Sequence, residues 1–297
     1  MKFEMPKIPY KLPITVLLAV KNEAINLPRC LDALNRVQKI IVIDSNSTDE
    51  TVRLAKDYGC EVIQFNYLGG YPKKRQWALN NLVINTDWIF LLDADEVVPQ
   101  DLWDEITKVL TSNPIENAFL ITKGFHFLGR TMRFGGFSHS AILLFRKNTA
   151  IFERIFEDDS DGLDMEIHER LIVDGAIGKL KKHLVHEDFK GLGAYIERHN
   201  KYSTWEAKLR YLQFKSGKYG KETIAPKFFG NEQERRRALK YFIIRLPFEN
   251  LVWFGYHYFL KLGFLEGRAG LIASQIRSSY ISQVRAKIYE LNLRNYM

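Results

Sequence analysis

The chain has 297 residues, of which 46% are hydrophobic and 13% aromatic, so it can bury one large or two small cores. This composition excludes a disordered chain and a short peptide scaffold. Two cysteines, Cys30 and Cys60, and the absence of an apolar segment after Met1 argue against a disulfide-stapled secreted fold and a cleaved secretory signal. We therefore expect a reducing, cytoplasmic location.

Positive charge is concentrated in the C-terminal third. The formal net charge is +8, but residues 1–189 carry a net charge of −4 and residues 190–297 carry +12. The second segment also holds 20 of the 39 aromatic residues. These differences predict two units, 1–189 and 190–297, and a polyanionic partner for the second, either a membrane face or a nucleic acid.

The first half of the chain alternates predicted strands with predicted helices. Apolar runs rich in β-branched residues predict buried strands over 12–20, 39–44, 61–65 and 87–93. Helical spacing of apolar residues predicts helices over 26–34 and 73–83, and between them a helix that starts just after Ser47 and stops near Gly59. Ser47 and Glu50 have the spacing of a capping box at the start of the second helix. This alternation predicts an α/β fold whose mainly parallel sheet has helices on both faces.

Ligands of such sheets bind outside the carboxyl ends of the strands, where polar residues follow three of the predicted strands. Neither a G-x-G-x-x-G loop nor a Walker lysine loop occurs, so a bound diphosphate needs another counter-charge. The acidic run 93–96 follows the fourth strand, and its carboxylates can hold a divalent cation that in turn binds phosphate oxygens. The alternative is a solvated acidic turn.

Four motifs occur in a fixed order along residues 14–98: Val20-Lys21-Asn22-Glu23, Val42-Ile43-Asp44-Ser45-Asn46-Ser47-Thr48-Asp49, Lys74-Arg75-Gln76-Trp77-Ala78-Leu79-Asn80 and Leu92-Asp93-Ala94-Asp95-Glu96. In this order they resemble the family 2 glycosyltransferases. The resemblance implies the GT-A fold, a Rossmann-like domain that binds nucleotide sugars, over residues 1–189. The charge and the apolar runs of residues 190–297 predict a helical, basic, amphipathic extension to this domain.

Further motifs resemble the branch that contains the lipopolysaccharide-core β-1,4-glucosyltransferases. They are Phe127-Leu128-Gly129-Arg130 with Met132-Arg133, Ile167-His168-Glu169, Leu184-Val185-His186, and Gly263-Phe264-Leu265-Glu266-Gly267-Arg268-Ala269-Gly270-Leu271. Two features depart from this branch. It usually has Asp where Glu266 stands, and the acidic stretch 150–165 has no clear counterpart, which leaves the acceptor open.

The resemblance assigns a donor pocket. It implies that Asp44 hydrogen-bonds the uracil of a UDP-sugar, with Asn22, Glu23 and Arg75 lining the same pocket. A strand-end carboxylate is suited to accept from a base N–H, and an arginine can stack on a base. The alternative for Asp44 is a turn or helix N-terminal carboxylate.

The resemblance also assigns a metal site. Asp93 is expected to bind the donor ribose and Asp95 the metal, Mn²⁺ or Mg²⁺, which neutralises the departing diphosphate. His186 is expected to complete the coordination sphere, the alternative being a structural histidine.

The expected catalytic base is Glu169, in His168-Glu169-Arg170. Inverting transfer needs one base that accepts the proton of the acceptor hydroxyl. Glu166 and Asp164 are the second choices. The alternative for Glu169 is a surface carboxylate paired with Arg170.

Two other segments, residues 125–137 and the pair Lys73 and Lys74, are not assigned to the site. Residues 125–137, FHFLGRTMRFGGF, form either an acceptor loop or a β-hairpin that contributes core aromatics. Lys73 and Lys74 are interpreted as a solvated basic turn.

The C-terminal third contains a predicted helix over 195–214, a polar loop over 215–221 and a dense apolar run over 251–265. The last is too short and too polar for a membrane span, and its length fits an interfacial helix beside the arginine cluster 235–237. The alternative is a helix whose rings cover the catalytic unit.

The resemblance therefore implies an inverting, metal-dependent enzyme of cell-envelope and lipopolysaccharide biosynthesis. It would move a hexose, with glucose expected, from a UDP-sugar to a lipid-linked saccharide or lipopolysaccharide-core acceptor. It would be peripheral on the anionic cytoplasmic face of the membrane. One alternative is a family 2 enzyme that uses another donor for another glycan. Another is a basic nucleic-acid-binding protein, which is disfavoured because no RRM, KH, helix-turn-helix or zinc-ligand spacing occurs.

Overall fold

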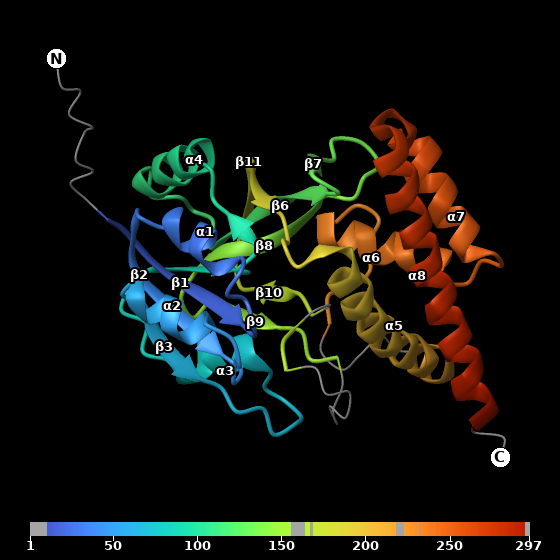
Figure 1. The fold of residues 1–297 in the computed structure, drawn as a ribbon, viewed down its shortest axis with the longest axis horizontal. Helices are drawn as coiled ribbons and strands as arrows, with labels where there is room; N and C mark the ends of the chain where they lie inside the picture. Colours follow the sequence, from blue (N-terminus) through green and yellow to red (C-terminus); the bar gives the residue numbers. More distant parts are fainter. Residues whose placement is uncertain (1–10, 156–163, 167–168, 218–222, 231, 295–297) are drawn as a thin grey trace.

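The structure is a computed structural model, and it describes residues 11–155, 164–166, 169–217, 223–230 and 232–294. Strands and helices alternate up to β4, and helices alone follow β11 (Figure 1). The strands are β1 (Leu12–Val20), β2 (Val37–Asp44), β3 (Glu61–Gln64), β4 (Trp88–Leu92), β5 (Glu96–Val97), β6 (Ala118–Phe127), β7 (Arg130–Thr131), β8 (His139–Arg146), β9 (Ala150–Phe152), β10 (Leu171–Val173) and β11 (Ile177–His186). The helices are α1 (Leu27–Asp32), α2 (Thr51–Asp57), α3 (Lys74–Asn81), α4 (Gln100–Thr111), α5 (Gly191–Ser216), α6 (Glu232–Ile243), α7 (Glu249–Gly255) and α8 (Gly267–Arg294), with a π-helical turn η1 (Tyr256–Leu260) and a 3₁₀ turn η2 (Gly263–Glu266).

One large sheet carries the strand order β3-β2-β1-β4-β8-β6-β11-β5, and β7 pairs with β6. The first four strands in this order are parallel, as predicted, and their register pairs Val20 with Asp44 and Asp44 with Gln64. β8 runs antiparallel to both β4 and β6, so the sheet as a whole is mixed. The α/β fold class is confirmed, and the carboxyl ends of the parallel strands meet at one edge.

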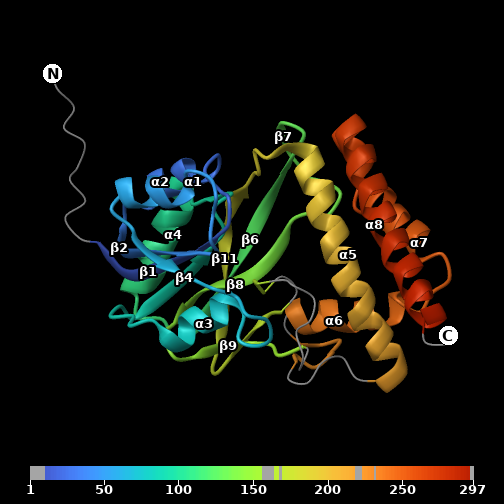
Figure 2. The ribbon, with the colours of Figure 1, turned by 60° about the horizontal axis from the view of Figure 1, so that its bottom comes forward.

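Helices cover both faces of the parallel strands (Figure 2). Alternate residues of β1 such as Val16 and Leu18 join a core with α1, α2 and α4. Leu17 points to the other face, where it joins a core with Ile41 and with Ala78 of α3. A strand buried on both faces needs a continuous apolar sequence, which is why the run over 12–20 identified it.

The capping box predicted at the start of α2 is wrong. Glu50 is the N-cap residue and not the third helical residue, and it makes no capping hydrogen bond through its side chain. The hydroxyl of Ser47 instead interacts with Asp44 and with the loop after β1. Tertiary contacts between the two loops therefore take the side chain that local spacing assigned to the helix.

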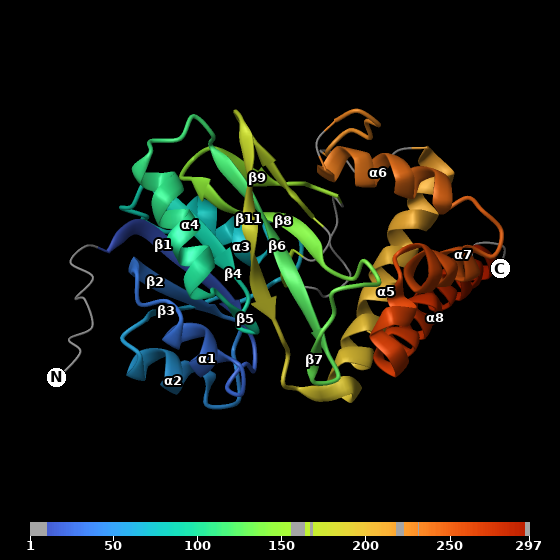
Figure 3. The ribbon, with the colours of Figure 1, turned by 90° about the horizontal axis from the view of Figure 1, so that it is seen from above.

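The helices after β11 pack beyond the β6 and β11 side of the sheet (Figures 1 and 3). Helix α5 confirms the helix predicted over 195–214, and it packs against α8. The predicted polar loop begins at Gly217, and residues 218–222 lie outside the described residues. None of the described helices is both long enough and apolar enough to cross a membrane.

The single helix expected over 251–265 is wrong, because the segment is divided into α7, η1 and η2. Leu262 adopts a left-handed backbone with φ of 58°, which ends the helical run. A Cβ atom at Gly263 would lie 2.6 Å from the carbonyl oxygen of His257, so this close return of the chain requires glycine.

Residues 125–137 form the β6–β7 hairpin and its return, and they contribute core aromatics. Phe127 and Met132 pack against Ala269 and Ala273 of α8. Glu266, where the branch usually has Asp, is buried and accepts hydrogen bonds from the backbone N–H groups of residues 133 and 134 at 2.6 and 2.8 Å. The longer side chain thus holds the hairpin against the start of α8.

Candidate functional site

The loops after β1 and β2 are joined to each other at the carboxyl edge of the sheet. Asn22 has a left-handed backbone, donates its N–H to Ser47 Oγ at 2.8 Å and accepts from the Thr48 N–H through Oδ1 at 2.8 Å. Asp44 is fully buried and accepts from the backbone N–H of Ser47 at 3.0 Å and from its hydroxyl. The structure thus places two predicted donor-binding residues together, with the Asp44 carboxylate engaged within its own turn.

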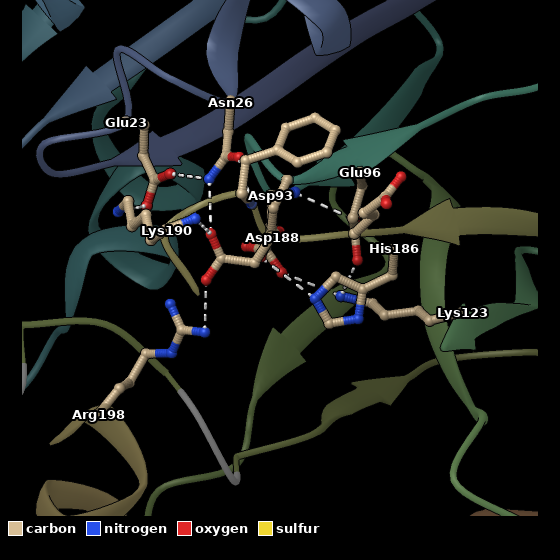
Figure 4. Close-up of polar contacts among 12 residues, drawn as sticks. Glu23, Asn26, Asp93, Glu96, Lys123, His186, Asp188, Lys190 and Arg198 are labelled. Carbon is tan, nitrogen blue, oxygen red and sulfur yellow. Dashed lines mark hydrogen bonds and ion pairs between the residues drawn. The ribbon is translucent and has the colours of Figure 1, made fainter. Parts of the chain in front are cut away.

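Asp93 lies in a network of buried charges (Figure 4). Arg75 forms an ion pair with one of its carboxylate oxygens, and Lys123 Nζ lies 3.0 Å from the other. Glu96 accepts from the Asp93 N–H at 3.0 Å and lies 2.5 Å from Lys123 Nζ. Burial alone would raise the pKa of Asp93, but the charges of Arg75 and Lys123 outweigh it and hold this pKa well below its usual value.

Asp95 and His186 face each other beside this network. His186 Nε2 lies 3.2 Å from Asp95 Oδ2, and the Glu187 N–H donates to the Asp95 carbonyl at 3.0 Å. The pairing of β11 with β5 sets His186 opposite Glu96. Burial lowers the pKa of His186, but the hydrogen bond and charge of Asp95 outweigh it, so the net shift is upward.

The two proposed metal ligands therefore meet, although they are 91 residues apart. No group of three or more His, Cys, Asp or Glu side chains that could hold a metal ion occurs among the described residues.

A second polar network joins the loop after β1 to the chain that follows β11 (Figure 4). Asn26 is fully buried and donates through Nδ2 to Glu23 Oε2 and to Asp188 Oδ1, both at 2.9 Å. Its Oδ1 accepts from the N–H of residue 189 at 3.0 Å. Lys190 Nζ lies 2.6 Å from Glu23 Oε1, and Arg198 lies 2.8 Å from Asp188 Oδ2.

This network lies close to Asp95. The pKa of Glu23 is raised by burial, and the charge of Asp95 adds to the rise. Glu23, which is predicted to bind the donor, directly follows Asn22 in the loop after β1. Its contacts with Lys190 and Asn26 join this loop to the segment after His186.

Glu169, the predicted base, is buried and paired with a lysine. Its Oε1 lies 3.0 Å from Lys73 Nζ, and the two side chains are 5% and 6% exposed. The ammonium of Lys73 also lies 5.7 Å from the ring centroid of Trp205 on α5. The structure therefore disagrees with a surface carboxylate, and His168 lies outside the described residues.

The two second choices for the base have other contacts. Glu166 accepts from the backbone N–H groups of Arg75 and Gln76 at 3.0 and 2.9 Å, at the N-terminus of α3. A carboxylate is favoured there because the first N–H groups of a helix have no partner within it. Asp164 lies 3.1 Å from Lys74 Nζ.

The interpretation of Lys73 and Lys74 as a solvated turn is wrong, since both are buried. Lys74 donates to the carbonyl of Val20 at 2.9 Å, at the point where β1 ends. Lys73 and Arg75 then connect Glu169 on one side with Asp93 on the other. The first residues of α3 thus link the predicted base to the strand-end carboxylates.

Sequence reasoning missed Lys123, Asn26 and Asp188. Lys123 interrupts a mostly apolar and aromatic strand, β6, and a lysine in such a run indicates a buried partner of opposite charge. Asn26 and Asp188 carried no comparable signal, because a polar residue near a helix start is common in any protein.

Comparison with known proteins agrees with this geometry. The sequence model for "Glycosyl transferase family 2" matches residues 15–136, which hold the loops after β1 and β2, the start of α3 and the acidic run after β4. The chain carries a family 2 glycosyltransferase domain. The resemblance seen in the sequence is confirmed.

Individual relatives extend the likeness beyond this domain. The chain is 24% identical over 285 residues to the lipopolysaccharide core biosynthesis glycosyltransferase LpsC of Rhizobium meliloti, covering 94% of this chain and 93% of the relative. It is 26% identical over 267 residues to an uncharacterized glycosyltransferase of Rickettsia felis, covering 89% and 84%.

The fold of this chain is similar to that of a solved glycosyltransferase structure. The mannosyltransferase PcManGT of Pyrobaculum calidifontis, in complex with GDP-Man and Mn²⁺, has a TM-score of 0.50 and 16% identity, covering 95% of this chain and 88% of that one. The two proteins thus share their fold, a GT-A domain followed by C-terminal helices, over nearly the whole of this chain.

Proposed function

We propose that this glycosyltransferase is an inverting, metal-dependent enzyme that transfers a hexose from a UDP-sugar to a lipid-linked saccharide or a lipopolysaccharide-core acceptor. The observation that carries the proposal is the meeting of Asp93, Asp95 and His186 beside the loop of Asn22 and Glu23. The likeness to LpsC supports the acceptor class.

The donor would lie across the joined loops after β1 and β2. Asn22, Glu23 and Asp44 would bind the nucleoside, and Arg75 with Lys123 holds Asp93 ionised and oriented for the ribose hydroxyls. Because Arg75 and Lys123 both contact Asp93, this carboxylate keeps one position before the donor arrives.

The donor set at Asp95 and His186 fits a divalent cation. A carboxylate and an imidazole whose reactive atoms lie 3.2 Å apart can bind the same ion, and the diphosphate of a donor has oxygens for its other positions. When bound, Mn²⁺ or Mg²⁺ supplies positive charge that stabilises the leaving diphosphate. The structural neighbour PcManGT is a complex with both GDP-Man and Mn²⁺.

Glu169 would act as the base. The carboxylate would accept the proton of the acceptor hydroxyl as the oxygen attacks the anomeric carbon and the bond to the UDP oxygen breaks. Lys73 fixes the position of Glu169, and the recess they share is also lined by Tyr71, Glu153 and Glu166.

The helical C-terminal region would hold the enzyme on an anionic membrane surface. Phe248, Leu251, Phe259 and Leu260 are between 61% and 76% exposed on α7, η1 and their flanks. Residues 190–297 carry a net charge of +12, so apolar contact and attraction to lipid phosphates act together. Sedimentation with anionic vesicles should be lost in the double variant Phe248→Ser with Leu260→Ser.

Calorimetric titration of UDP, GDP, CDP and ADP, each with and without Mn²⁺, tests the donor half of this proposal. We expect UDP to bind selectively, to need the metal, and to lose binding in Asp95→Ala. Preference for GDP would instead indicate a family 2 enzyme with another donor. Binding of no nucleotide under any condition would refute the proposed site.

A further inference from the structure

A cavity of about 170 Å³ opens between α5, α6 and residues 223–226. Its surface is mostly hydrocarbon, contributed by Leu209, Ile224, Pro226, Tyr241 and Ile244. A cavity of this kind favours an apolar ligand, because water inside it would have few polar partners.

The cationic side chains at the wall are already paired with carboxylates. Arg210 contacts both Glu206 and Glu249 at 2.6 to 2.9 Å, and Lys240 Nζ lies 2.7 Å from Glu206. Arg237 contacts the Glu153 carboxylate at 2.8 and 2.9 Å. A charged ligand group would have to compete with these pairs, so the body of the ligand that fits is uncharged.

One wall residue offers a hydrogen-bond acceptor. The Oε1 atom of Gln213 is buried and has no hydrogen-bond partner among the described residues, and Gln213 is only 3% exposed. A buried carbonyl without a partner costs free energy, which a hydroxyl or amide N–H of a ligand would recover.

Exposed aromatic residues flank the cavity. Phe242 directly follows the lining residue Tyr241, and Phe228 lies two residues after the lining residue Pro226. Their ring centroids lie 5.6 Å apart. Both are more than half exposed, and Phe229 is fully exposed. Such an exposed apolar rim is typical of a surface that meets lipid or another apolar partner.

The wall of the cavity is connected to the predicted base. Glu153 accepts from the N–H of Ile224 at 2.6 Å and from Arg237 at 2.8 and 2.9 Å, both on the cavity side. The same Glu153 accepts from the N–H of Arg170 at 3.1 Å, and it lines the recess that contains Glu169.

We propose that this cavity binds a hydrocarbon chain of the lipid that carries the acceptor saccharide, with a hydroxyl or amide N–H of that lipid donating to Gln213 Oε1. The chain would be anchored beside α6 while the saccharide extends past Glu153 toward Glu169. This inference rests on the proposed transfer to a lipid-borne acceptor.

Octyl glucoside below its micellar concentration tests the cavity directly, with methyl glucoside as the probe that lacks the chain. We expect calorimetry to detect binding of the first only, and binding to weaken at least tenfold in Ala225→Trp, which fills the cavity from an exposed lining position. Leu239→Trp, on α6 but outside the lining, is the matched control and should bind as wild type. Thr223→Trp fills the same cavity if Ala225→Trp fails to fold.

UDP titration of the same variants separates the two proposals. Unchanged metal-dependent UDP binding with lost octyl glucoside binding supports the cavity as a separate lipid site. Equal binding of octyl glucoside to wild type and to both filled variants would overturn it, whatever the outcome with UDP. If the protein binds octyl glucoside but no nucleotide, the cavity is supported as a binding site for a hydrocarbon chain, and only the proposed transfer from a UDP-sugar is refuted.

Discussion

Asn26 Nδ2 donates a 2.9 Å hydrogen bond to Asp188 Oδ1 across 162 residues of chain. The same amide contacts Glu23, so it joins the loop beside the proposed donor pocket to the segment that follows His186. A fully buried amide with all these partners fixes the distance between the two segments.

Replacing Asn26 by Ala should therefore damage both stability and donor binding. We expect a loss of about 2–4 kcal/mol in the free energy of unfolding, because Glu23 and Asp188 lose a buried donor. The KM for the donor should rise more than kcat falls. Urea unfolding and steady-state kinetics measure the two effects, and Asn292→Ala, which removes an exposed amide that donates to the carbonyl of Ile288, should change neither. An unchanged KM in a folded Asn26→Ala protein would contradict the link.

Glu169→Gln tests the base without removing volume. General base catalysis contributes about 10²–10⁴-fold, so kcat should fall by that factor while metal-dependent UDP binding persists. Glu166→Gln is the comparison, since Glu166 accepts from the N-terminus of α3 and its substitution should mainly lower the melting temperature. A kcat within threefold of wild type in Glu169→Gln would remove it from the mechanism.

Substitution of Arg210 tests how much a buried ion-pair cluster stabilises the helical C-terminal region. It is 2% exposed and pairs with Glu206 and Glu249, which are also buried, so Arg210→Met would remove the buried cation that these two carboxylates share and leave Glu206 with Lys240 and Glu249 with Arg285 at 3.6 Å. We expect a loss of about 3–5 kcal/mol. Lys201→Met breaks a bridge whose side chains are 65% and 72% exposed and should cost about 0–1 kcal/mol. Equal denaturant midpoints for the two variants would show that the buried cluster adds little.

The sequence specified the parallel half of the fold well, because β1, β2 and β4 are buried on both faces and must be continuously apolar. Polar residues at their ends then located Asn22, Asp44 and Asp95. Contacts between segments that are far apart in the chain could not be predicted from the sequence. Lys73 and Lys74 have the sequence of a solvated turn, yet Glu169 and Asp164 bury them. Likewise, Ser47 was assigned to a local cap but contacts the loop of Asn22.

His257 should make the stability of the protein fall as the medium is acidified. Burial, together with the charges of Arg277 and Lys261, lowers its pKa from 6.5 to about 4, although the hydrogen bond to the Gly135 carbonyl opposes the shift. The unfolded chain therefore binds more protons than the folded one between pH 6.5 and about 4, so stability is full above this window and is lost on going down through it. Between pH 7.5 and 5 the loss from this group is about 2 kcal/mol.

The variant His257→Asn, which keeps a hydrogen-bond donor for the Gly135 carbonyl, should reduce the pH dependence of the melting temperature. Part of the remaining pH dependence should come from His199, because burial also lowers the pKa of His199 to about 4. An identical pH dependence in His257→Asn and wild type would show that His257 titrates alike in the folded and unfolded chains.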